Sequence, residues 1–136
     1  MSTMGTNLEQ VAAAQAREAV SQAQQQSMAD TLERVATKAL GVLQEQGVYA
    51  LVLYLYARPE REAEAARLVR GALFAAWQAL PGVPSEVQAL HRDTPALEAL
   101  HVFEKHLLPD VRRLMLAREL FEQTLIYIRY AARAVT

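Results

Sequence analysis

The amino-acid sequence predicts an all-α fold, a compact bundle of about six helices with a long C-terminal helix. The 136 residues include 25 Ala and 19 Leu but only five Gly, five Pro and one Asn, a composition that favours helix interiors over turn-rich sheet. Apolar residues also recur three and four positions apart, the spacing of one helical face. A chain of this length fits one domain. We therefore expect a single helical domain over residues 1–136, with residues 1–6 disordered.

The first helix is expected to begin near Asn7, because Thr6 followed by Glu9 has the spacing of a capping box. The polar stretch 21–27 contains four glutamines. It is either a projecting tip of this helix or a break before a second helix, which Ser27 would cap together with Asp30.

The second helix is expected to end at Gly47, a residue that tolerates positive φ. The next segment, 48–57 (VYALVLYLYA), suits a strand by composition, but no second strand-like run exists to pair with it. We therefore interpret it as a buried helix.

Proline residues divide the second half into further helices. Pro59 suits the first turn of a helix that continues to Leu80, and Ser85 is expected to cap a short piece that ends near Leu90. A helix after Thr94 would direct Leu97, Leu100, Phe103 and Leu107 inward. From Pro109 to Val135 there is no helix breaker, and an apolar line from Val111 to Val135, with Arg118 interrupting it, predicts one long helix.

Composition and charge limit the possible functions. The formal net charge is −1, so binding to nucleic acid would need a local basic patch. The absence of cysteine excludes disulfides and thiolate chemistry. No secretory-type leader is recognisable, and the longest apolar stretch is about half of the roughly 20 residues that a spanning helix needs. We expect a soluble, cytoplasmic protein.

Catalytic and metal-binding patterns are scarce. The Glu-x-x-His spacing of bundle metal sites occurs once, at Glu98 and His101, and such a site would need further ligands. No nucleophile elbow, phosphate loop or zinc-protease motif occurs. We predict no enzyme activity, no cofactor and no metal. A metal-dependent enzyme built on Glu98 and His101 is the alternative.

The basic residues gather toward the C-terminus, where residues 105–136 carry six basic and three acidic side chains, whereas residues 81–104 carry one and four. Arginine forks suit phosphate, but they pair equally well with carboxylates. Tyrosines accompany these arginines and can stack on unpaired bases, although on apolar stripes they more often belong to the core or its rim. They are Tyr49, Tyr54, Tyr56, Tyr127 and Tyr130.

Three blocks of the sequence, in the same order, resemble the small α-helical subunit of the type III-B CRISPR effector, the Cmr complex. They are the opening Asn7-Leu8-Glu9-Gln10, the segment 47–58 (GVYALVLYLYAR) and the closing segment 127–134 (YIRYAARA). The small subunit of type III-A effectors has a similar helical form and role, so membership of that subtype is an alternative.

The resemblance implies a non-catalytic subunit for antiviral defence, whose copies stack into a minor filament beside the other effector subunits. It also implies contact with guide and target RNA through phosphates, without sequence specificity. For that contact we predict Arg112, Arg113, Arg129 and Arg133, followed by Lys38, Arg58 and Arg70.

The acidic segment 81–104 and residues 24–26 are predicted to contact protein partners, including further copies of the chain. A helical adaptor that binds only protein, through the long terminal helix, is the other alternative.

Overall fold

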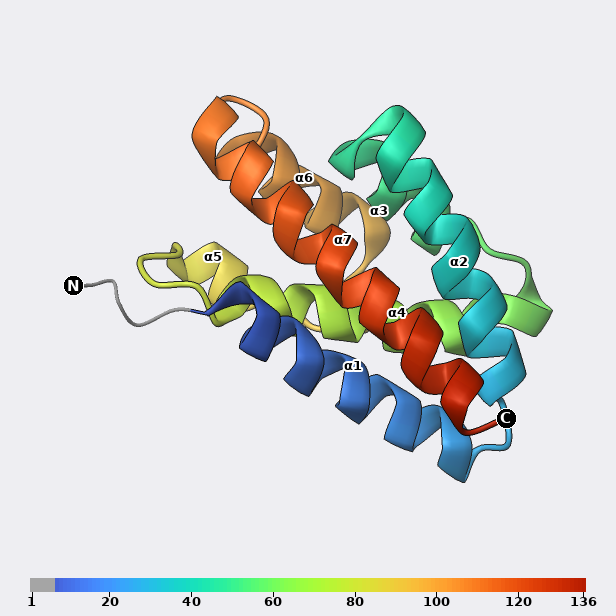
Figure 1. The fold of residues 1–136 in the computed structure, drawn as a ribbon. Coiled ribbons are helices and arrows are strands. Elements are labelled where there is room, and N and C mark those ends of the chain that lie inside the picture. The colour runs from blue at the N-terminus through green and yellow to red at the C-terminus, as the bar shows by residue number, and fades with distance from the viewer. Residues whose placement is uncertain (1–6) are drawn as a thin grey trace.

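The computed structural model describes residues 7–136, and these form seven α-helices and no strand, which confirms the all-α prediction (Figure 1). In chain order the helices are α1 (Leu8–Gln25), α2 (Ala29–Gln46), α3 (Val48–Tyr56), α4 (Glu60–Gln78), α5 (Ser85–Gln88), α6 (Ala96–His106) and α7 (Val111–Ala134).

The long helix α7 is the centre of the bundle. In Figure 1 it crosses the front of the molecule, with α1 and α2 on either side of its C-terminal half and α4 behind it. Its buried stripe repeats at three and four residues and consists of Ala117, Leu120, Phe121, Thr124, Leu125, Ile128 and Ala132. This stripe is wide enough to pack against three helices at once.

An aromatic group forms the middle of the core. The ring of Phe103 on α6 lies 4.8 Å from Trp77 and 6.0 Å from Phe74, both on α4, and 6.2 Å from Phe121 on α7, measured between centroids. Tilted aromatic pairs at these separations stabilise a core beyond the area they bury. The ring of Phe103 therefore anchors α6 in the core, together with the buried Ala99, Leu100 and Val102.

Residues 48–56 are helical, as the lack of a partner strand predicted, and Gly47 stands between α2 and α3 with φ of +98°. Helix α1 begins next to Asn7, as predicted, but the capping residues differ from the predictions. Asn7 caps α1 by accepting a bond from the N–H of Gln10, while Thr6 lies outside the described residues. The cap of α2 is Met28, without a side-chain bond, because Ser27 takes a left-handed φ of +56° in the turn.

The inward-facing lists were wrong at two helix ends. Leu97 is 82% exposed and Val111 is 68% exposed, although both lie on the apolar lines that were predicted to face the core. Each stands in the first turn of its helix, where the apolar line continues beyond the neighbouring helices. Leu100, Phe103 and Leu107 are buried as expected.

Candidate nucleic-acid interface

Helices α2 and α7 run antiparallel, and three contacts define how they lie against each other. Arg133 Nη1 lies 3.5 Å from Glu33 Oε2, Gln44 Nε2 donates to Glu122 Oε2 at 3.0 Å, and Arg118 Nη2 donates to the carbonyl of Gln44 at 3.2 Å. This pairing places the middle of α2 beside the C-terminal third of α7.

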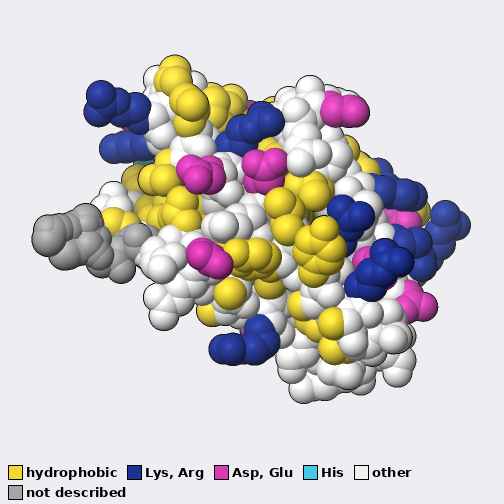
Figure 2. Space-filling view, viewed as in Figure 1, with side chains coloured by type: hydrophobic (Ala, Val, Ile, Leu, Met, Phe, Trp, Pro, Cys, Tyr) yellow, Lys and Arg dark blue, Asp and Glu magenta, His cyan; other side chains and the backbone are white. Residues whose placement is uncertain are grey.

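The antiparallel pairing brings together four basic residues, which we call the C-terminal basic cluster: Arg34, Lys38, Arg129 and Arg133. Figure 2 shows dark-blue side chains crowded along the right-hand edge, over α2 and the C-terminal part of α7, with some magenta among them. Three of the four members were predicted from the sequence. Arg34 was missed, because its position beside α7 depends on the tertiary pairing.

The carboxylates within this surface leave it with a positive excess. Arg133 is paired with Glu33, but its side chain is 70% exposed and the separation is long, so the pair contributes little and leaves the guanidinium available. The guanidinium of Arg129 lies beside its neighbour Tyr130, 5.6 Å from the ring centroid. Arg34 donates only to the hydroxyl of Thr31, at 3.4 Å.

Arg112 and Arg113 lie at the opposite end of α7. Both are exposed, and Arg113 forms an ion pair with Asp110, the residue whose side chain caps the helix. Sixteen residues separate Arg113 from Arg129, which is roughly 25 Å at the rise of an α-helix. The predicted arginines of α7 therefore form two separate sites.

Arg58 and Arg70 have roles inside the fold. The guanidinium of Arg58 stacks 3.8 Å from the ring centroid of Tyr54 and pairs with the buried Glu62 at 3.4 Å. Arg70 lies over the ring of Tyr56 and donates to the carbonyls of Leu55 at 3.4 Å and Arg92 at 2.9 Å. These contacts hold α3 and α4 together.

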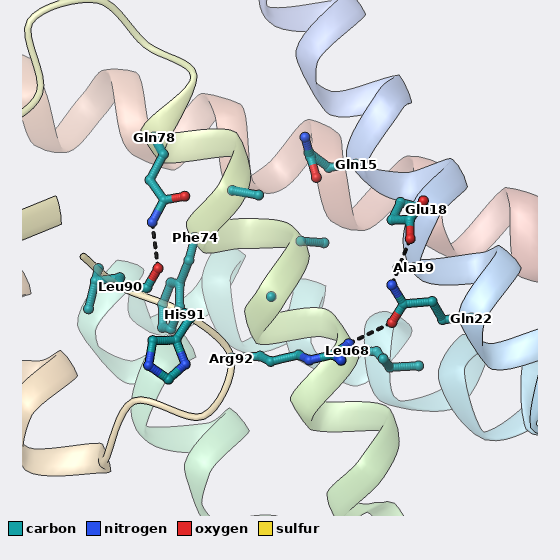
Figure 3. Close-up of a pocket in the computed structure, with 13 residues that line it drawn as sticks. Gln15, Glu18, Ala19, Gln22, Leu68, Phe74, Gln78, Leu90, His91 and Arg92 are labelled. Atoms are coloured by element: carbon teal, nitrogen blue, oxygen red, sulfur yellow. Dashed lines mark hydrogen bonds between the residues drawn. The ribbon is translucent and has the colours of Figure 1, made fainter. Parts of the chain in front are cut away.

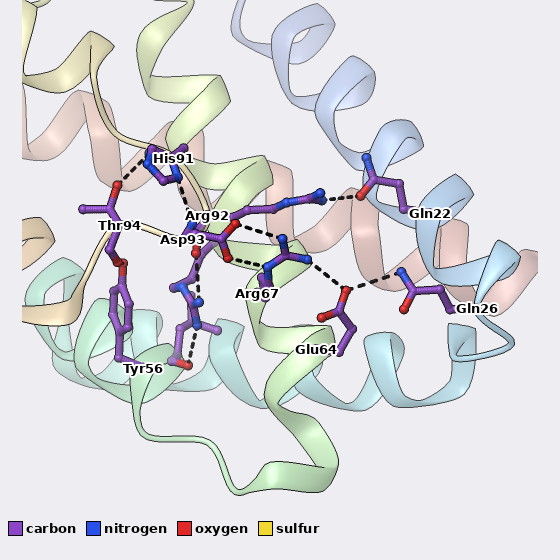
Figure 4. A network of polar contacts seen from close by, with 11 residues as sticks. Gln22, Gln26, Tyr56, Glu64, Arg67, His91, Arg92, Asp93 and Thr94 are labelled. Atoms are coloured by element: carbon purple, nitrogen blue, oxygen red, sulfur yellow. Dashed lines mark hydrogen bonds and ion pairs between the residues drawn. The ribbon is translucent and has the colours of Figure 1, made fainter.

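A polar network around residues 90–95 ties the loop before α6 to three helices (Figure 4). Arg67 holds Asp93 with two bonds of 2.5 and 2.9 Å, and the hydroxyl of Tyr56 donates to the carbonyl of Thr94 at 2.7 Å. Arg92 reaches Gln22 on α1 at 2.6 Å. The bond from Arg67 lowers the pKa of Asp93 below its ordinary value.

Two of the other three acidic groups of residues 81–104, Glu86 and Glu104, also have partners within the chain. Glu86 accepts from His106 at 2.7 Å and from Lys105 at 3.0 Å, and these bonds lower its pKa. Glu104 accepts a bond from the hydroxyl of Tyr49. The negative charge predicted to attract protein partners therefore serves largely to fasten α5 and α6 to the bundle.

A polar hollow of about 290 Å³ lies over α4, with α1 on one side and the loop before α6 on the other (Figure 3). Its hydrogen-bonding groups are largely bound to one another. Gln22 donates to Glu18 at 2.7 Å and accepts from Arg92, while Gln78 donates to the carbonyl of Leu90 at 2.6 Å. The polar groups of the hollow are thus largely satisfied within the chain, which does not favour a ligand-binding site there.

A larger groove of about 650 Å³ lies between α1 and the C-terminal third of α7. Ala13, Ala16 and Val20 line it from α1, and Tyr127 and Tyr130 from α7. The volume is in the usual range for binding sites of roughly 300–1,000 Å³. This groove adjoins the C-terminal basic cluster through Arg129, the neighbour of Tyr130.

An apolar patch covers the corner where α6 leads into α7, at the other end of the long helix. Its members are large exposed hydrophobic side chains: Leu108 at 42%, Val111 at 68%, Met115 at 65% and Leu116 at 43% exposure. Contiguous apolar surface of this kind commonly marks a contact site for another protein.

The residues of the alternative metal site do not gather further ligands. In the part of the chain that the structure describes, no group of three or more His, Asp or Glu side chains could hold a metal ion. His101 is exposed on α6, His106 is bonded to Glu86, and the Nδ1 of His91 accepts from the N–H of Asp93.

Comparison with known proteins yields no match to any family model, curated protein or solved structure. Within residues 7–136, every helix is too short or too polar to cross a membrane.

Proposed function

We propose that this chain is a non-catalytic RNA-contacting subunit of a CRISPR effector of the type III-B (Cmr) class, with type III-A as the alternative subtype. The observation that carries the proposal is the C-terminal basic cluster on α2 and α7. Four cations from two helices lie on one edge of a chain whose net charge is −1. Such a patch suits an RNA backbone, which is recognised by charge without reading the bases.

The cluster is small, and this fits a subunit better than an independent RNA-binding protein. Each neutralised phosphate adds a limited electrostatic gain that salt removes, so four cations give weak binding alone. An array of such subunits along one RNA would add their contacts at high local concentration. We therefore expect useful affinity only in an assembly.

The apolar patch at the α6–α7 corner supports assembly with neighbouring subunits, including copies of the chain itself. It lies about one helix length from the basic cluster, so a neighbour could cover it while the cluster still faced RNA. Val111→Asp/Met115→Asp should reduce copurification of the other effector subunits. Both side chains are largely exposed, so the fold should survive the change.

Filter binding with a single-stranded RNA of mixed sequence, at about 50 and 200 mM salt, tests the RNA contact. Arg129→Glu/Arg133→Glu should weaken retention at low salt and reduce the salt slope by about one to two units, because two phosphate contacts are lost. The control is Arg61→Glu/Lys105→Glu, which makes the same change in net charge at two residues outside the cluster and also removes the ion pair of Lys105 with Glu86. Equal effects of both double variants would contradict a localised interface.

Arg112→Glu/Arg113→Glu asks whether the second basic end of α7 also contacts RNA. A loss equal to that of the first pair would extend the interface along the whole helix. An unchanged affinity would confine it to the C-terminal basic cluster.

A helical adaptor that binds only protein is the second candidate, and the apolar patch favours it. Purification of the chain together with its partners from its own cells distinguishes the two proposed functions. An effector subunit should bring along other subunits and RNA of uniform length. Recovery of a protein partner without RNA would support the adaptor.

A further inference from the structure

The groove between α1 and α7 combines an apolar floor with an exposed aromatic ring. Small side chains line much of it, among them Ala13 and Ala16 on α1 and Ala131 and Ala134 on α7. Tyr130 stands at its wall with 61% of its surface exposed. A flat group could therefore lie against the ring without displacing any large side chain.

One cation lines the groove and another lies next to its exposed ring. Arg17 lines it from α1, and the guanidinium of Arg129, outside the lining, lies 5.6 Å from the ring centroid of Tyr130. No ion pair involves Arg17 or Arg129 among residues 7–136. Glu9 is the one carboxylate in the lining, and Arg133 lies on the side of α7 that faces α2, where it pairs with Glu33.

This combination fits an unpaired nucleotide better than a purely apolar partner. Proteins hold single-stranded RNA by stacking its bases on aromatic rings while arginines contact the phosphates alongside. A base in a duplex is already stacked on its neighbours and could not reach the ring. The groove supplies an apolar face for a base, and Arg17 on α1 and Arg129 beside Tyr130 supply cations for the neighbouring backbone.

We propose that the α1–α7 groove receives an unpaired base of bound RNA, stacked on Tyr130, while Arg17 and Arg129 contact the flanking phosphates. This inference rests on the proposed RNA contact and adds to it a preference for unpaired over duplex RNA. Tyr130 acts as a binding residue without base specificity, since every base has a flat aromatic face.

The test uses RNA that carries 2-aminopurine, a fluorescent base whose emission falls when it stacks. The wild-type protein should quench the fluorescence of 2-aminopurine in single-stranded RNA, whereas Tyr130→Ala should not, and its affinity for this RNA should fall about fivefold or more. Tyr130→Phe should retain both the quenching and the affinity because the ring remains. Ala13→Glu, which fills the groove with a carboxylate at an exposed position, should abolish them.

Duplex RNA and the salt dependence provide the internal controls. The affinity for a duplex of the same sequence should be equal in the wild type and in Tyr130→Ala, and the salt slope of Tyr130→Ala should be unchanged because no phosphate contact is removed. Leu97→Ala, a truncation at another exposed position that does not line the groove, should behave as the wild type.

The outcomes separate this inference from the proposed function. If the wild type retains RNA but Tyr130→Ala and Ala13→Glu bind it equally well, the base site is overturned and the phosphate contact stands. If no RNA is retained even with partner subunits, the proposed function itself fails. If Tyr130→Ala and Ala13→Glu change only the oligomeric state measured by sedimentation, the groove binds a second copy of the chain. That result also overturns the base site.

Discussion

The molecule uses its arginines in two ways, and the contrast lies between the region around α3, α4 and residues 90–95 and the C-terminal end of α7. In the first region, Arg58, Arg67 and Arg70 donate to carbonyls and carboxylates of the same chain, and Arg58 and Arg70 also stack on tyrosine rings. Among residues 7–136, only the buried Nε of Arg70 in this group has no partner within the protein although solvent does not reach it. In the second, Arg129 and Arg133 have one aromatic neighbour and one long ion pair.

The difference shows that residue type and local sequence do not reveal which arginine is available to a partner. An arginine with carbonyls within reach of its planar fork becomes part of the fold, because leaving those donors unpaired would be costly. An arginine on an exposed helix face keeps its donors for another molecule. Removing an arginine of each kind should therefore give opposite results in stability and binding.

The largest effect on stability is expected from Arg70→Ala. This change removes two charged hydrogen bonds, to Leu55 and Arg92, and the contact with Tyr56, so the free energy of unfolding should fall by about 2–3 kcal/mol. Arg129→Ala/Arg133→Ala should change it by no more than about 0.5 kcal/mol. Urea denaturation of the three proteins measures both values. Similar losses in the two variants would remove the distinction between the regions.

A smaller effect of opposite sign is expected from Tyr54→Phe in the same region. Among residues 7–136 the buried hydroxyl of Tyr54 has no hydrogen-bond partner, while its ring lies 3.8 Å from the guanidinium of Arg58. Phenylalanine keeps the ring and removes the unpaired hydroxyl group. The free energy of unfolding should therefore stay the same or rise by up to about 1 kcal/mol. Tyr56→Phe is the matched control, and it should destabilise, because the hydroxyl of Tyr56 donates to Thr94.

The fold could be predicted from the sequence because helical periodicity is local. The segment 48–56 is helical although its composition suits a strand, and the lack of any partner run was enough to decide this. Helix ends were harder. Leu97 and Val111 continue an apolar line past the point where neighbouring helices stop, and no local pattern says where a neighbour stops.

The candidate site was less predictable for a related reason. Charge counts identified the C-terminal helix as basic, but the partner positions Arg34 and Lys38 lie about 95 residues away along the chain. Only the pairing of α2 with α7 brings them near Arg129. Arg17 was likewise missed, because nothing on α1 alone indicates that a groove lies beside it.

The smallest effect concerns the network around residues 90–95 at low pH. Its ion pair between Arg67 and Asp93 lowers the pKa of Asp93 below the ordinary value near 3.8. A carboxyl group whose folded pKa is depressed stabilises the protein above its unfolded pKa, and this contribution is lost as the pH falls through the folded value. The melting temperature of the wild type should therefore exceed that of Asp93→Asn slightly at roughly pH 6, and the difference should shrink as the pH falls below about 3.8 and through the lowered folded pKa.

Glu86 on α5 provides a second carboxyl group for comparison with Asp93. Its pKa is also lowered, by bonds from His106 and Lys105, so Glu86→Gln should lose its own share of the acid dependence. If the two ion pairs act independently, the Asp93→Asn/Glu86→Gln double variant should lose the sum of their two contributions to the acid dependence, since separated sites add. An acid dependence that survives unchanged in the Asp93→Asn/Glu86→Gln double variant would show that neither ion pair causes it.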